Sequence, residues 1–225
     1  MSILEIYWKI FKRIIIHIII MKKIGIIGFG SFTREIIPRI KKPFDIFVSS
    51  DYLEKISNLH DIEKNYNCKI YSLEKYSVDK YKALVTLTNS EQRKLIIESM
   101  PINTEYYTFI DKKACILDKN INIGKGSIIC AGSVLTTNIN LGKFSQINLN
   151  TTIGHDCIIG DYFTTAPGVN ISGNCKIGNH VYFGTNSSIK EKITVSDNVI
   201  FGLNAGITKN INDCGVYIGT PVKKI

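Results

Sequence analysis

A six-residue period governs the stretch Ile147-Asn-Leu-Asn-Thr-Thr-Ile153-Gly-His-Asp-Cys-Ile-Ile159-Gly-Asp-Tyr-Phe-Thr-Thr165 and its surroundings. Sixteen consecutive frames of six residues run from position 117 to position 212, and all but the frame at Thr165 begin with an aliphatic or aromatic residue. The second position is Gly, Ala, Ser, Thr or Cys in thirteen frames, seven of them Gly. A period of six fits neither an α-helix nor a plainly alternating strand. It is typical of a parallel β-helix, in which each frame forms one short strand and a corner.

The repeat predicts a three-sided prism. Three frames make one coil of 18 residues, so sixteen frames give slightly more than five coils. We expect the small residue after each inward residue to permit the corner, and neighbouring coils to pair main chain with main chain. Prisms of this type wind left-handed and commonly pack around a threefold axis, so we expect a left-handed parallel β-helix and a homotrimer. The expected inward positions are Leu117, Ile123, Ile129, Leu135, Leu141, Ile147, Ile153, Ile159, Thr165, Ile171, Ile177, Phe183, Ile189, Val195, Phe201 and Ile207.

The first half of the chain has no repeat and reads as alternating strands and helices. The segment Gly28-Phe-Gly-Ser-Phe-Thr33 joins the first strand to a helix. This order suits phosphate binding, because a helix N-terminus presents free N–H groups. Ligands of a small parallel sheet bind at the carboxyl ends of its strands, so we predict an α/β, Rossmann-like nucleotide-binding domain here. Its expected strands are 24–27, 45–48, 83–87 and a fourth around 106–110, and its expected helices are 34–40 and 91–100.

The chain therefore divides into four segments. We expect an N-terminal extension at 1–20, the Rossmann-like domain at 21–111, the left-handed β-helix at 112–212 and a C-terminal tail at 213–225.

The extension is apolar but carries several charges, including Lys9, Lys12 and Arg13. Its uncharged run is too short to span a bilayer, and no small-residue cleavage site follows it. We interpret it as dispensable, or as the result of a start codon placed upstream of Met21. The alternative is a basic amphipathic helix that touches a membrane or a partner. We expect a cytoplasmic protein.

The net charge of +9 suits anionic partners, including phosphate-bearing small molecules. Lysines and arginines are not interleaved with aromatic residues in any cluster, so we expect no nucleic-acid binding. A dinucleotide fingerprint would need a third glycine where Thr33 stands. A domain of about 85 residues also fits a mononucleotide or a nucleotide sugar better than a dinucleotide.

The six cysteines show neither a CxxC pattern nor metal-like spacing with histidine. Cys157 and Cys175 lie one coil apart and should stack on one face of the prism. We interpret them as buried free thiols, with a disulfide as the alternative.

His155 lies at the third position of its frame and is followed by Asp156, so its side chain should project outward near a corner. A zinc site of the γ-carbonic-anhydrase type would need three histidines, and the prism has only His180 besides, so we expect no metal. On its own, His155 reads as a solvated surface imidazole or as a general base.

Three motifs of the chain are specific: Ile153-Gly-His155-Asp156-Cys-Ile-Ile-Gly160-Asp161, Leu87-Thr-Asn89-Ser-Glu-Gln-Arg93 and Gly215-Val-Tyr-Ile-Gly219-Thr-Pro221-Val-Lys. Together they resemble those of one family, the bacterial sugar-nucleotide acetyltransferases with a small nucleotide-binding domain and a left-handed β-helix. They include N-acetyltransferases of UDP- or dTDP-4-amino sugars and sialic-acid O-acetyltransferases. The resemblance covers about residues 22–225.

The resemblance implies His155 as the general base and Asp156, which is Glu in some relatives, as the residue that orients it. Asp156 could instead pair with a residue of the adjacent subunit. The implied nucleotide-sugar contacts are Gly30, Ser31, Phe32, Ser49, Ser50 and Thr88, and the implied acetyl-CoA contacts, between adjacent prisms, are Thr164, Gly173, Thr185 and Leu203.

The sequence also departs from this family. Relatives often have Gly-Ala-Gly-Gly-His-Gly after the first strand, where this chain has Gly-Phe-Gly-Ser-Phe-Thr. They often have acidic residues in place of Ser49-Ser50, a second histidine in place of Thr164 and glycine in place of Thr88.

The implied reaction is acetyl transfer from acetyl-CoA to the amine of a nucleotide-linked 4-amino sugar, for example a UDP-viosamine-type 4,6-dideoxy sugar. A main-chain N–H, such as that of Gly173 one coil beyond His155, could stabilise the oxyanion. Two alternatives stay open: O-acetylation of a sugar or sialic acid, and a non-catalytic trimeric β-helix that binds a glycan or nucleotide.

Overall fold

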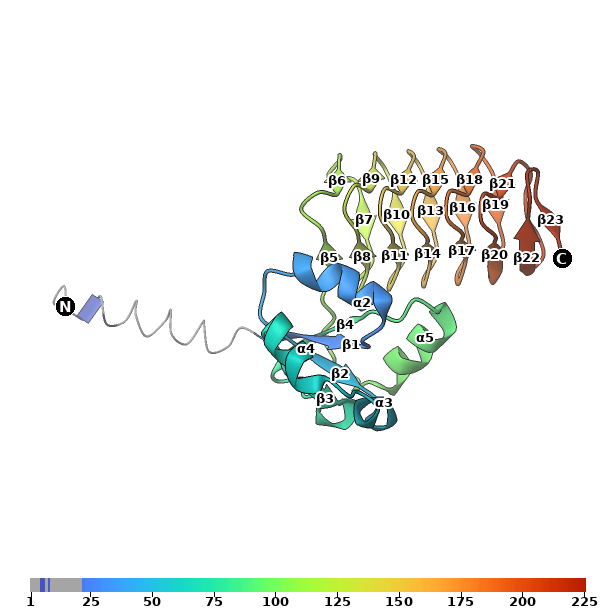
Figure 1. Cartoon of the computed structure of the whole chain (residues 1–225). Helices are drawn as coiled ribbons and strands as arrows, with labels where there is room; N and C mark the ends of the chain where they lie inside the picture. The colour runs from blue at the N-terminus through green and yellow to red at the C-terminus, as the bar shows by residue number, and fades with distance from the viewer. Residues whose placement is uncertain (1–4, 7, 9–21) are drawn as a thin grey trace.

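The computed structural model of the chain describes Glu5, Ile6, Trp8 and residues 22–225. Apart from those three exposed residues, the predicted extension at 1–20 lies outside the described residues, as does Met21. The same holds for the alternative of an amphipathic helix. From residue 22 onward the chain forms an α/β part and then a long prism of short strands, whose successive coils follow one another in a row (Figure 1).

The α/β part contains a four-stranded sheet in the order β3-β2-β1-β4, with every neighbouring pair parallel. Its two inner strands are buried on both faces, as expected for continuous apolar runs such as Ile-Gly-Ile-Ile. In chain order the elements are β1 (Lys23–Ile27), α2 (Ser31–Ile36), the 3₁₀ turn η1 (Ile37–Arg39), β2 (Phe44–Val48), α3 (Ser50–Glu54), α4 (Leu59–Tyr66), β3 (Ile70–Ser72), η2 (Leu73–Lys75), β4 (Tyr81–Val85) and α5 (Ser90–Ser99).

Two details of the predicted sheet are wrong. The edge strand β3 was not expected, because three residues are too short to show a pattern. The expected strand around 106–110 does not form: Tyr106 makes only an isolated bridge to Ala83, and Phe109–Ile110 (β5) belongs to the prism. The helix expected at 34–40 begins earlier, at Ser31, and ends in η1 because Pro38 cannot continue an α-helix.

The prism has three faces, and in each face strands from successive coils pair in parallel. The second face contains β6 (Cys115–Ile116), β9 (Val134–Leu135), β12 (Thr152–Ile153), β15 (Asn170–Ile171), β18 (Ser188–Ile189) and β21 (Gly206–Ile207). The third face contains β7 (Asn122–Ile123), β10 (Asn140–Leu141), β13 (Ile158–Ile159), β16 (Lys176–Ile177) and β19 (Thr194–Val195). The first, which we call the seam face, contains β5 (Phe109–Ile110), β8 (Ile128–Ile129), β11 (Gln146–Ile147), β14 (Thr164–Thr165), β17 (Tyr182–Phe183), β20 (Val199–Phe201), β22 (Gly215–Ile218) and the antiparallel β23 (Lys223–Lys224).

This arrangement is a parallel β-helix and fits the left-handed class that the repeat predicts. Inside it the frame-opening side chains stack, and Phe183 lies with its ring centre 4.7 Å from that of Phe201. The exceptional opener, Thr165, is also buried, where its hydroxyl accepts a hydrogen bond from the N–H of Asn148 at 2.9 Å and lies 3.0 Å from the hydroxyl of Thr151.

The corners are not where we expected them. The fourth residue of each six-residue frame, from position 126 to position 204, has a positive φ. At most of these positions the residue is not glycine. The second-position glycines do not have this conformation and serve close packing instead. A Cβ on Gly142, for example, would lie 2.3 Å from the carbonyl carbon of Gly160 in the next coil.

The first frame is out of register by one residue. Ile116 pairs with Leu135 and takes the inward place that we assigned to Leu117, whose side chain is 64% exposed. The extra residue lies between β6 and β7, in the terminal coil, where the next coil packs on one side only. A bulge there disturbs less packing than it would between two coils.

The α/β part packs against the seam face, and buried polar groups join the two. The guanidinium of Arg93 in α5 donates to the carbonyls of Leu87 and Thr88 at 2.8 and 3.1 Å, and to two groups of the prism. These are the carbonyl of Tyr162 and the hydroxyl of Thr164, both at 2.8 Å. Arg93 is 1% exposed, and burial lowers its pKa to about 10.

Two further contacts fix the same junction. The side-chain amide of Gln146 donates to the carbonyls of Val85 and Leu87 at 3.2 and 3.1 Å. The Arg39 guanidinium pairs with both carboxylate oxygens of Asp111, at 2.7 and 2.8 Å. No helix within the described residues is long and apolar enough to cross a membrane.

Candidate active site

His155 and Asp156 occupy the corner between the second and third faces of the prism, after β12 and before β13. The imidazole Nδ1 lies 2.7 Å from the Asp156 carboxylate, so the predicted pair forms within one chain. The His155 side chain is 58% exposed, which leaves Nε2 open to solvent. Asp156 has a φ of 60°, one of the left-handed corner conformations.

Asn138 holds the other oxygen of the Asp156 carboxylate, with its side-chain amide 2.5 Å away. This hydrogen bond, together with the one to His155, lowers the pKa of Asp156. The carboxylate therefore stays ionised well below neutral pH and can stabilise an imidazolium at His155. Asn138 lies 18 residues before Asp156, so the coil length alone could have identified it from the sequence.

Gly173 lies directly beside the imidazole, one coil beyond His155. A Cβ at this position would be 2.6 Å from Nε2 of His155, so any larger residue would displace the ring. Among the described residues, nothing accepts a hydrogen bond from the main-chain N–H of Gly173. The glycine thus leaves both space and a free donor next to the atom that would take the proton.

A cleft of about 650 Å³ lies between the N-terminus of α5 and the seam face. It brings together Thr88, Thr164 and Thr185, of which Thr88 was implied as a nucleotide contact and the others as acetyl-CoA contacts. Thr164 is buried, and its hydroxyl is already the acceptor of Arg93. Asn148 lines the same cleft.

His180 also lines this cleft, although we assigned it no function. Its ring stacks on Tyr162, with centres 4.7 Å apart and planes 13° apart. Glu91 of α5 places a carboxylate oxygen 3.1 Å from Nδ1. Burial is the largest influence on His180 and lowers its pKa, so the imidazole is neutral near pH 7.

A second cleft, of about 600 Å³, lies over the carboxyl ends of β1 and β2. Gly30 and Ser31 line it, together with Tyr52, whose hydroxyl donates to the carbonyl of Phe29 at 3.0 Å. Phe32, implied as a nucleotide contact, is instead buried in the core of the α/β part. It packs there because the face of α2 that carries Phe32 and Ile36 lies against the sheet.

Ser49 and Ser50 begin α3 and are committed to local contacts. Ser49 accepts the N–H of Tyr52 at 3.4 Å as the N-cap, and Ser50 donates to Glu74 at 3.1 Å. Leu203 is 66% exposed at the corner between the seam face and the second face, two coils from Pro167 at the edge of the larger cleft.

Within one chain, the other implied residues fall into three places: the cleft over β1 and β2, the cleft at the seam face, and the His155 corner. Phe32, Ser49, Ser50 and Leu203 line neither cleft. In the triangular cross-section, the corner between the second and third faces lies opposite the seam face. His155 consequently does not reach either cleft of its own chain.

The cysteines make no disulfide among the described residues, and Cys157 and Cys175 are both fully buried inside the prism. Hydrogen bonding to the sulfur of Cys175, together with burial, raises the pKa of Cys157. Within residues 22–225, no group of three His, Cys, Asp or Glu side chains is arranged to hold a metal ion.

Comparison with solved structures gives high similarity over most of the chain. The acetyltransferase domain of PglB from Neisseria gonorrhoeae superposes with a TM-score of 0.79 at 22% identity, covering 91% of this chain and 100% of that one. WeeI from Acinetobacter baumannii gives 0.79 at 26% identity, with coverage of 91% and 100%. The chain has the fold of the hexapeptide-repeat acetyltransferases.

A third similar structure is PerB from Caulobacter crescentus in complex with CoA and GDP-perosamine, with a TM-score of 0.74 and 15% identity over 91% of this chain and 98% of that one. No protein-family model matches the chain, and a search of curated proteins gives no match. The shared fold covers both the α/β part and the prism, since 91% of this chain is aligned.

Sequence reasoning missed the residues that join the two parts. Arg93 stands in a motif that we singled out, but nothing in the motif relates it to Thr164, because that contact follows no period. The contact between Glu91 and His180 likewise follows no period of the sequence. Only contacts between coils, such as Asn138 with Asp156, repeat at a spacing that can be read from the sequence.

Proposed function

We propose that the protein transfers the acetyl group of acetyl-CoA to the amine of a nucleotide-linked 4-amino sugar. The observation that carries the proposal is the His155–Asp156 pair, with Nε2 of His155 kept unobstructed by Gly173. The fold shared with the PglB acetyltransferase domain supports it. So does the complex of PerB with CoA and GDP-perosamine, a nucleotide-linked amino sugar.

The chemistry requires one proton acceptor. The sugar nitrogen attacks the thioester carbonyl carbon, and its proton passes to Nε2 of His155. The tetrahedral intermediate then collapses with cleavage of the C–S bond, and the CoA thiolate takes the proton from the imidazolium. Asp156 holds Nδ1–H, so that the lone pair is on Nε2, and stabilises the positive charge that forms.

The oxyanion of the tetrahedral intermediate needs a donor near Nε2. The free N–H of Gly173 lies on the same corner and supplies one without any side-chain movement. General-base catalysis contributes about 10²–10⁴-fold, and a single oxyanion donor about 10²–10³-fold.

A complete site on this geometry takes residues from two protomers. His155 is on the corner opposite the seam face, whereas both clefts lie on the side of the α/β part. A homotrimer packed around a threefold axis would place the His155 corner of one prism against the seam-face cleft of the next. Acetyl-CoA would then lie between adjacent prisms, along Thr185, Leu203 and Gly173.

The α/β part would bind the nucleotide as a Rossmann-like domain. Its strand order, 3-2-1-4, is that of the first four strands of the doubly wound fold, and its clefts lie at the carboxyl ends of the strands. Gly30 and Ser31 stand at the N-terminus of α2, where Gly30 has no side chain to exclude a phosphate. The sugar would extend from there past Thr88 into the seam-face cleft.

The test is release of free CoA thiol from acetyl-CoA in the presence of UDP-, dTDP- and GDP-linked 4-amino sugars, including a viosamine-type 4,6-dideoxy sugar. Wild type is compared with His155→Ala, which should lose at least about 10²-fold in kcat. Because the His155 side chain is exposed, the variant should fold normally, and its thermal unfolding provides the control.

The outcomes separate the candidate functions. Release with an amino-sugar nucleotide, abolished in His155→Ala, supports the proposal and identifies the nucleotide. Release only with hydroxyl acceptors would replace it with sugar O-acetylation. A folded protein that releases no CoA thiol with any acceptor would favour a non-catalytic binding scaffold.

A further inference from the structure

Glu91 and His180 form a second pair of a carboxylate and an imidazole, which the proposed reaction does not use. Glu91 belongs to the first turn of α5, and His180 to the corner of the prism that precedes β17. Nδ1 of His180 lies 3.1 Å from a carboxylate oxygen of Glu91. Both side chains line the seam-face cleft, where the proposed function places the sugar, so the pair would contact the sugar directly.

Packing fixes the imidazole of His180 and leaves one of its nitrogens available. The ring stacks on Tyr162, and the His180 side chain is only 11% exposed. Nδ1 is buried and has no aligned hydrogen bond within the described residues, so the neighbouring carboxylate favours the tautomer with the proton on Nδ1. Nε2 then carries the lone pair, and no described residue donates a hydrogen bond to it. The imidazole therefore presents a hydrogen-bond acceptor to the cleft.

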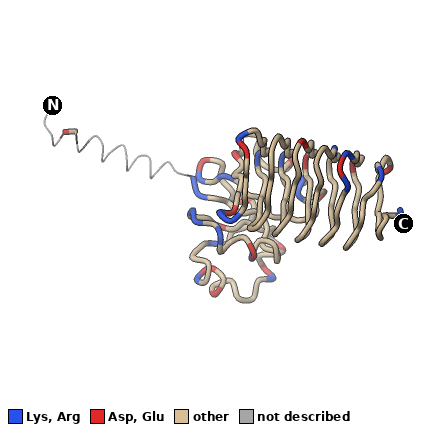
Figure 2. The backbone as a smooth tube through the Cα atoms, turned by 90° about the horizontal axis from the view of Figure 1, so that it is seen from above, with Lys and Arg blue, Asp and Glu red and all other residues tan. Residues whose placement is uncertain are grey.

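Glu91 is the only charged side chain among the described residues that line the seam-face cleft. The other polar groups there are hydroxyls and amides, such as those of Thr88, Asn148 and Asn198. The chain has a net charge of +9, and Figure 2 shows lysine and arginine positions spread over the α/β part and along the prism, yet none of the described ones lines this cleft. The cleft therefore suits a cation, whereas the carboxylate would repel a phosphate group.

The other charges around His180 are already committed or lie outside the cleft. Arg93 is buried and donates to four acceptors at the junction. Lys94 is on the same helix but does not line the cleft. Asp197, from the prism, accepts the main-chain N–H and the side-chain amide of Asn179, at 2.7 and 3.1 Å. These groups therefore leave the carboxylate of α5 as the charge that a ligand in the cleft would meet.

The N-terminus of α5 also faces the cleft, and its dipole would by itself favour an anion. Asn89 caps this end by accepting the N–H of Gln92 at 2.9 Å. The dipole amounts to about half a positive charge, whereas the carboxylate of Glu91 in the first turn carries a full negative charge. The field at this rim is therefore that of the carboxylate.

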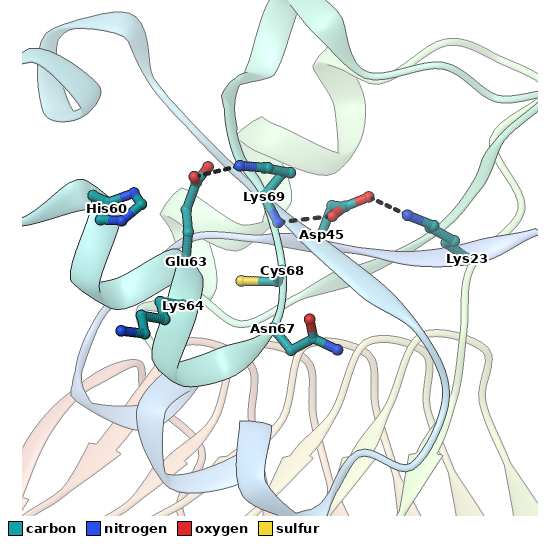
Figure 3. A pocket seen from close by; sticks show the side chains of 8 residues that line it. All are labelled: Lys23, Asp45, His60, Glu63, Lys64, Asn67, Cys68 and Lys69. Atoms are coloured by element: carbon teal, nitrogen blue, oxygen red, sulfur yellow. Dashed lines mark hydrogen bonds and ion pairs between the residues drawn. The ribbon is translucent and has the colours of Figure 1, made fainter.

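A hollow of about 330 Å³ in the α/β part also contains a histidine and two carboxylates, but it lacks free acceptors, as Figure 3 shows. Asp45 binds Lys23 at 3.1 Å, and Glu63 binds Lys69 at 2.8 Å. Both carboxylates are thus neutralised by lysines that line the same hollow. At the seam-face cleft, by contrast, no described lysine or arginine pairs with the carboxylate, which leaves it available to a ligand.

We propose that Glu91 and His180 bind the amino group of the acceptor sugar and make the protein select an amine over a hydroxyl. The inference rests on the proposed function and adds the residues that determine which acceptor is used. Two hydrogen-bond acceptors stand side by side here, one of them charged. An ammonium group donates to both, whereas a hydroxyl has a single proton and turns a lone pair toward the carboxylate.

The same pair gives the first proton of the substrate a route to solvent. A primary amine is protonated near neutral pH and must lose one proton before its lone pair can attack. Nε2 of His180 takes that proton while Nδ1 passes its own to Glu91, so the imidazole changes tautomer and stays neutral. Glu91 is 63% exposed and returns the proton to solvent. The second proton leaves during the attack and passes to His155, and the amide product, which has no positive charge, is held less tightly.

The test is calorimetric titration of the full chain, without acetyl-CoA, with 4-amino-4,6-dideoxy sugars linked to UDP, dTDP and GDP and with their 4-hydroxy counterparts. Wild type should bind the amino form of the accepted nucleotide sugar more tightly than the hydroxy form. Glu91→Gln should weaken binding of the amino form about 10–100-fold, the effect of one hydrogen bond to a charged group, and leave the hydroxy form unchanged. His180→Phe keeps a ring to stack on Tyr162 but removes Nε2, and should also weaken the amino form selectively.

The matched control is Glu98→Gln, which removes the same charge from α5 seven residues further on, where Glu98 is exposed and does not line the cleft. It should bind both forms like wild type. Equal weakening in Glu91→Gln and Glu98→Gln would reduce the effect to net charge and overturn the proposal. A wild type that does not distinguish the two forms would overturn it too, as would a Glu91→Gln variant that weakens both forms alike or neither.

The thiol-release assay separates this inference from the proposed function. If CoA release is abolished in His155→Ala while Glu91→Gln keeps the wild-type preference, acetyl transfer stands and the role of the pair is refuted. If the amino form binds selectively and no CoA is released, acetyl transfer is refuted and the pair stands as an amine-binding site.

Discussion

Replacing Arg93 with methionine tests how the α/β part and the prism are joined. The substitution keeps much of the side-chain volume but removes the charge and all four hydrogen bonds of the guanidinium. The Leu87 carbonyl would keep the side-chain amide of Gln146 as a donor. The carbonyls of Thr88 and Tyr162 and the Thr164 hydroxyl would lose the donor that Arg93 supplies, in a site where the arginine is 1% exposed. Water cannot replace those donors unless the junction opens.

The size of the effect follows from two opposing contributions. Each acceptor left without its donor costs about 1–3 kcal/mol, so the three cost about 6 kcal/mol. In return, the variant no longer buries a cation without a carboxylate beside it. The lowering of the Arg93 pKa from 12.5 to about 10 places that burial cost at about 3 kcal/mol. We expect Arg93→Met to lower the free energy of unfolding by about 3 kcal/mol, the difference between these two contributions.

The assay is urea denaturation at fixed protein concentration, followed by amide hydrogen exchange at the β4–α5 junction. The control is Arg34→Met on α2, because Arg34 is exposed and its side chain makes one hydrogen bond within the described residues, to Ser31 at 3.3 Å. That variant should change stability by less than about 0.5 kcal/mol. If Arg93→Met unfolded at the wild-type denaturant concentration with unchanged exchange at Leu87 and Thr88, the junction would not depend on Arg93, and our reasoning would be refuted.

Three further predictions concern the corners and the cleft. Gly173→Ala should lower kcat about 100-fold, because its Cβ displaces the His155 ring, with little change in thermal stability. Gly142→Ala should instead destabilise the fold, because its Cβ meets main chain, and should change kcat little. Calorimetry and thiol release on both variants check the contrast. Asp156→Asn should lower kcat by about 10²–10⁴-fold and Asp156→Glu much less, and an Asn variant with wild-type kcat would remove Asp156 from the mechanism. His180 has a lowered pKa in the folded protein, so its contribution to stability is complete above about pH 6.5 and is lost as the pH falls through the folded value. The melting temperature of His180→Phe should therefore decline less between pH 7 and pH 5 than that of wild type.

Much of the prism could be predicted because its contacts repeat. A residue and its neighbour in the next coil are 18 positions apart, so burial of Ile153 or Phe183 follows from the period alone. The same period places Gly173 beside His155 and Asn138 beside Asp156. The period says nothing about where a terminal coil departs from it, and therefore Leu117 was assigned to the wrong side.

The parts of the site that were not predicted depend on contacts with no regular spacing. Phe32 was implied as a ligand contact from its place in a motif, but the direction of its side chain is set by the packing of α2 on the sheet. Arg93 and Glu91 contact the prism only because the whole α/β part packs against it. The predicted bounds of α2 were wrong, and the edge strand β3 was not predicted, for a related reason. Short elements are stabilised by tertiary packing more than by their own sequence.

The final pair of strands in the prism has a consequence for assembly. A coil that hydrogen-bonds to the coil below it also offers unpaired main-chain groups above, so a stack of such coils has no natural length and could grow by adding other molecules end to end. Here the chain reverses direction after β22, and β23 runs antiparallel along it, with Lys223 and Lys224 facing outward. An approaching coil would meet a strand of the wrong polarity that carries two positive charges. Strands β22 and β23 thus cover this end of the prism and oppose the addition of another coil.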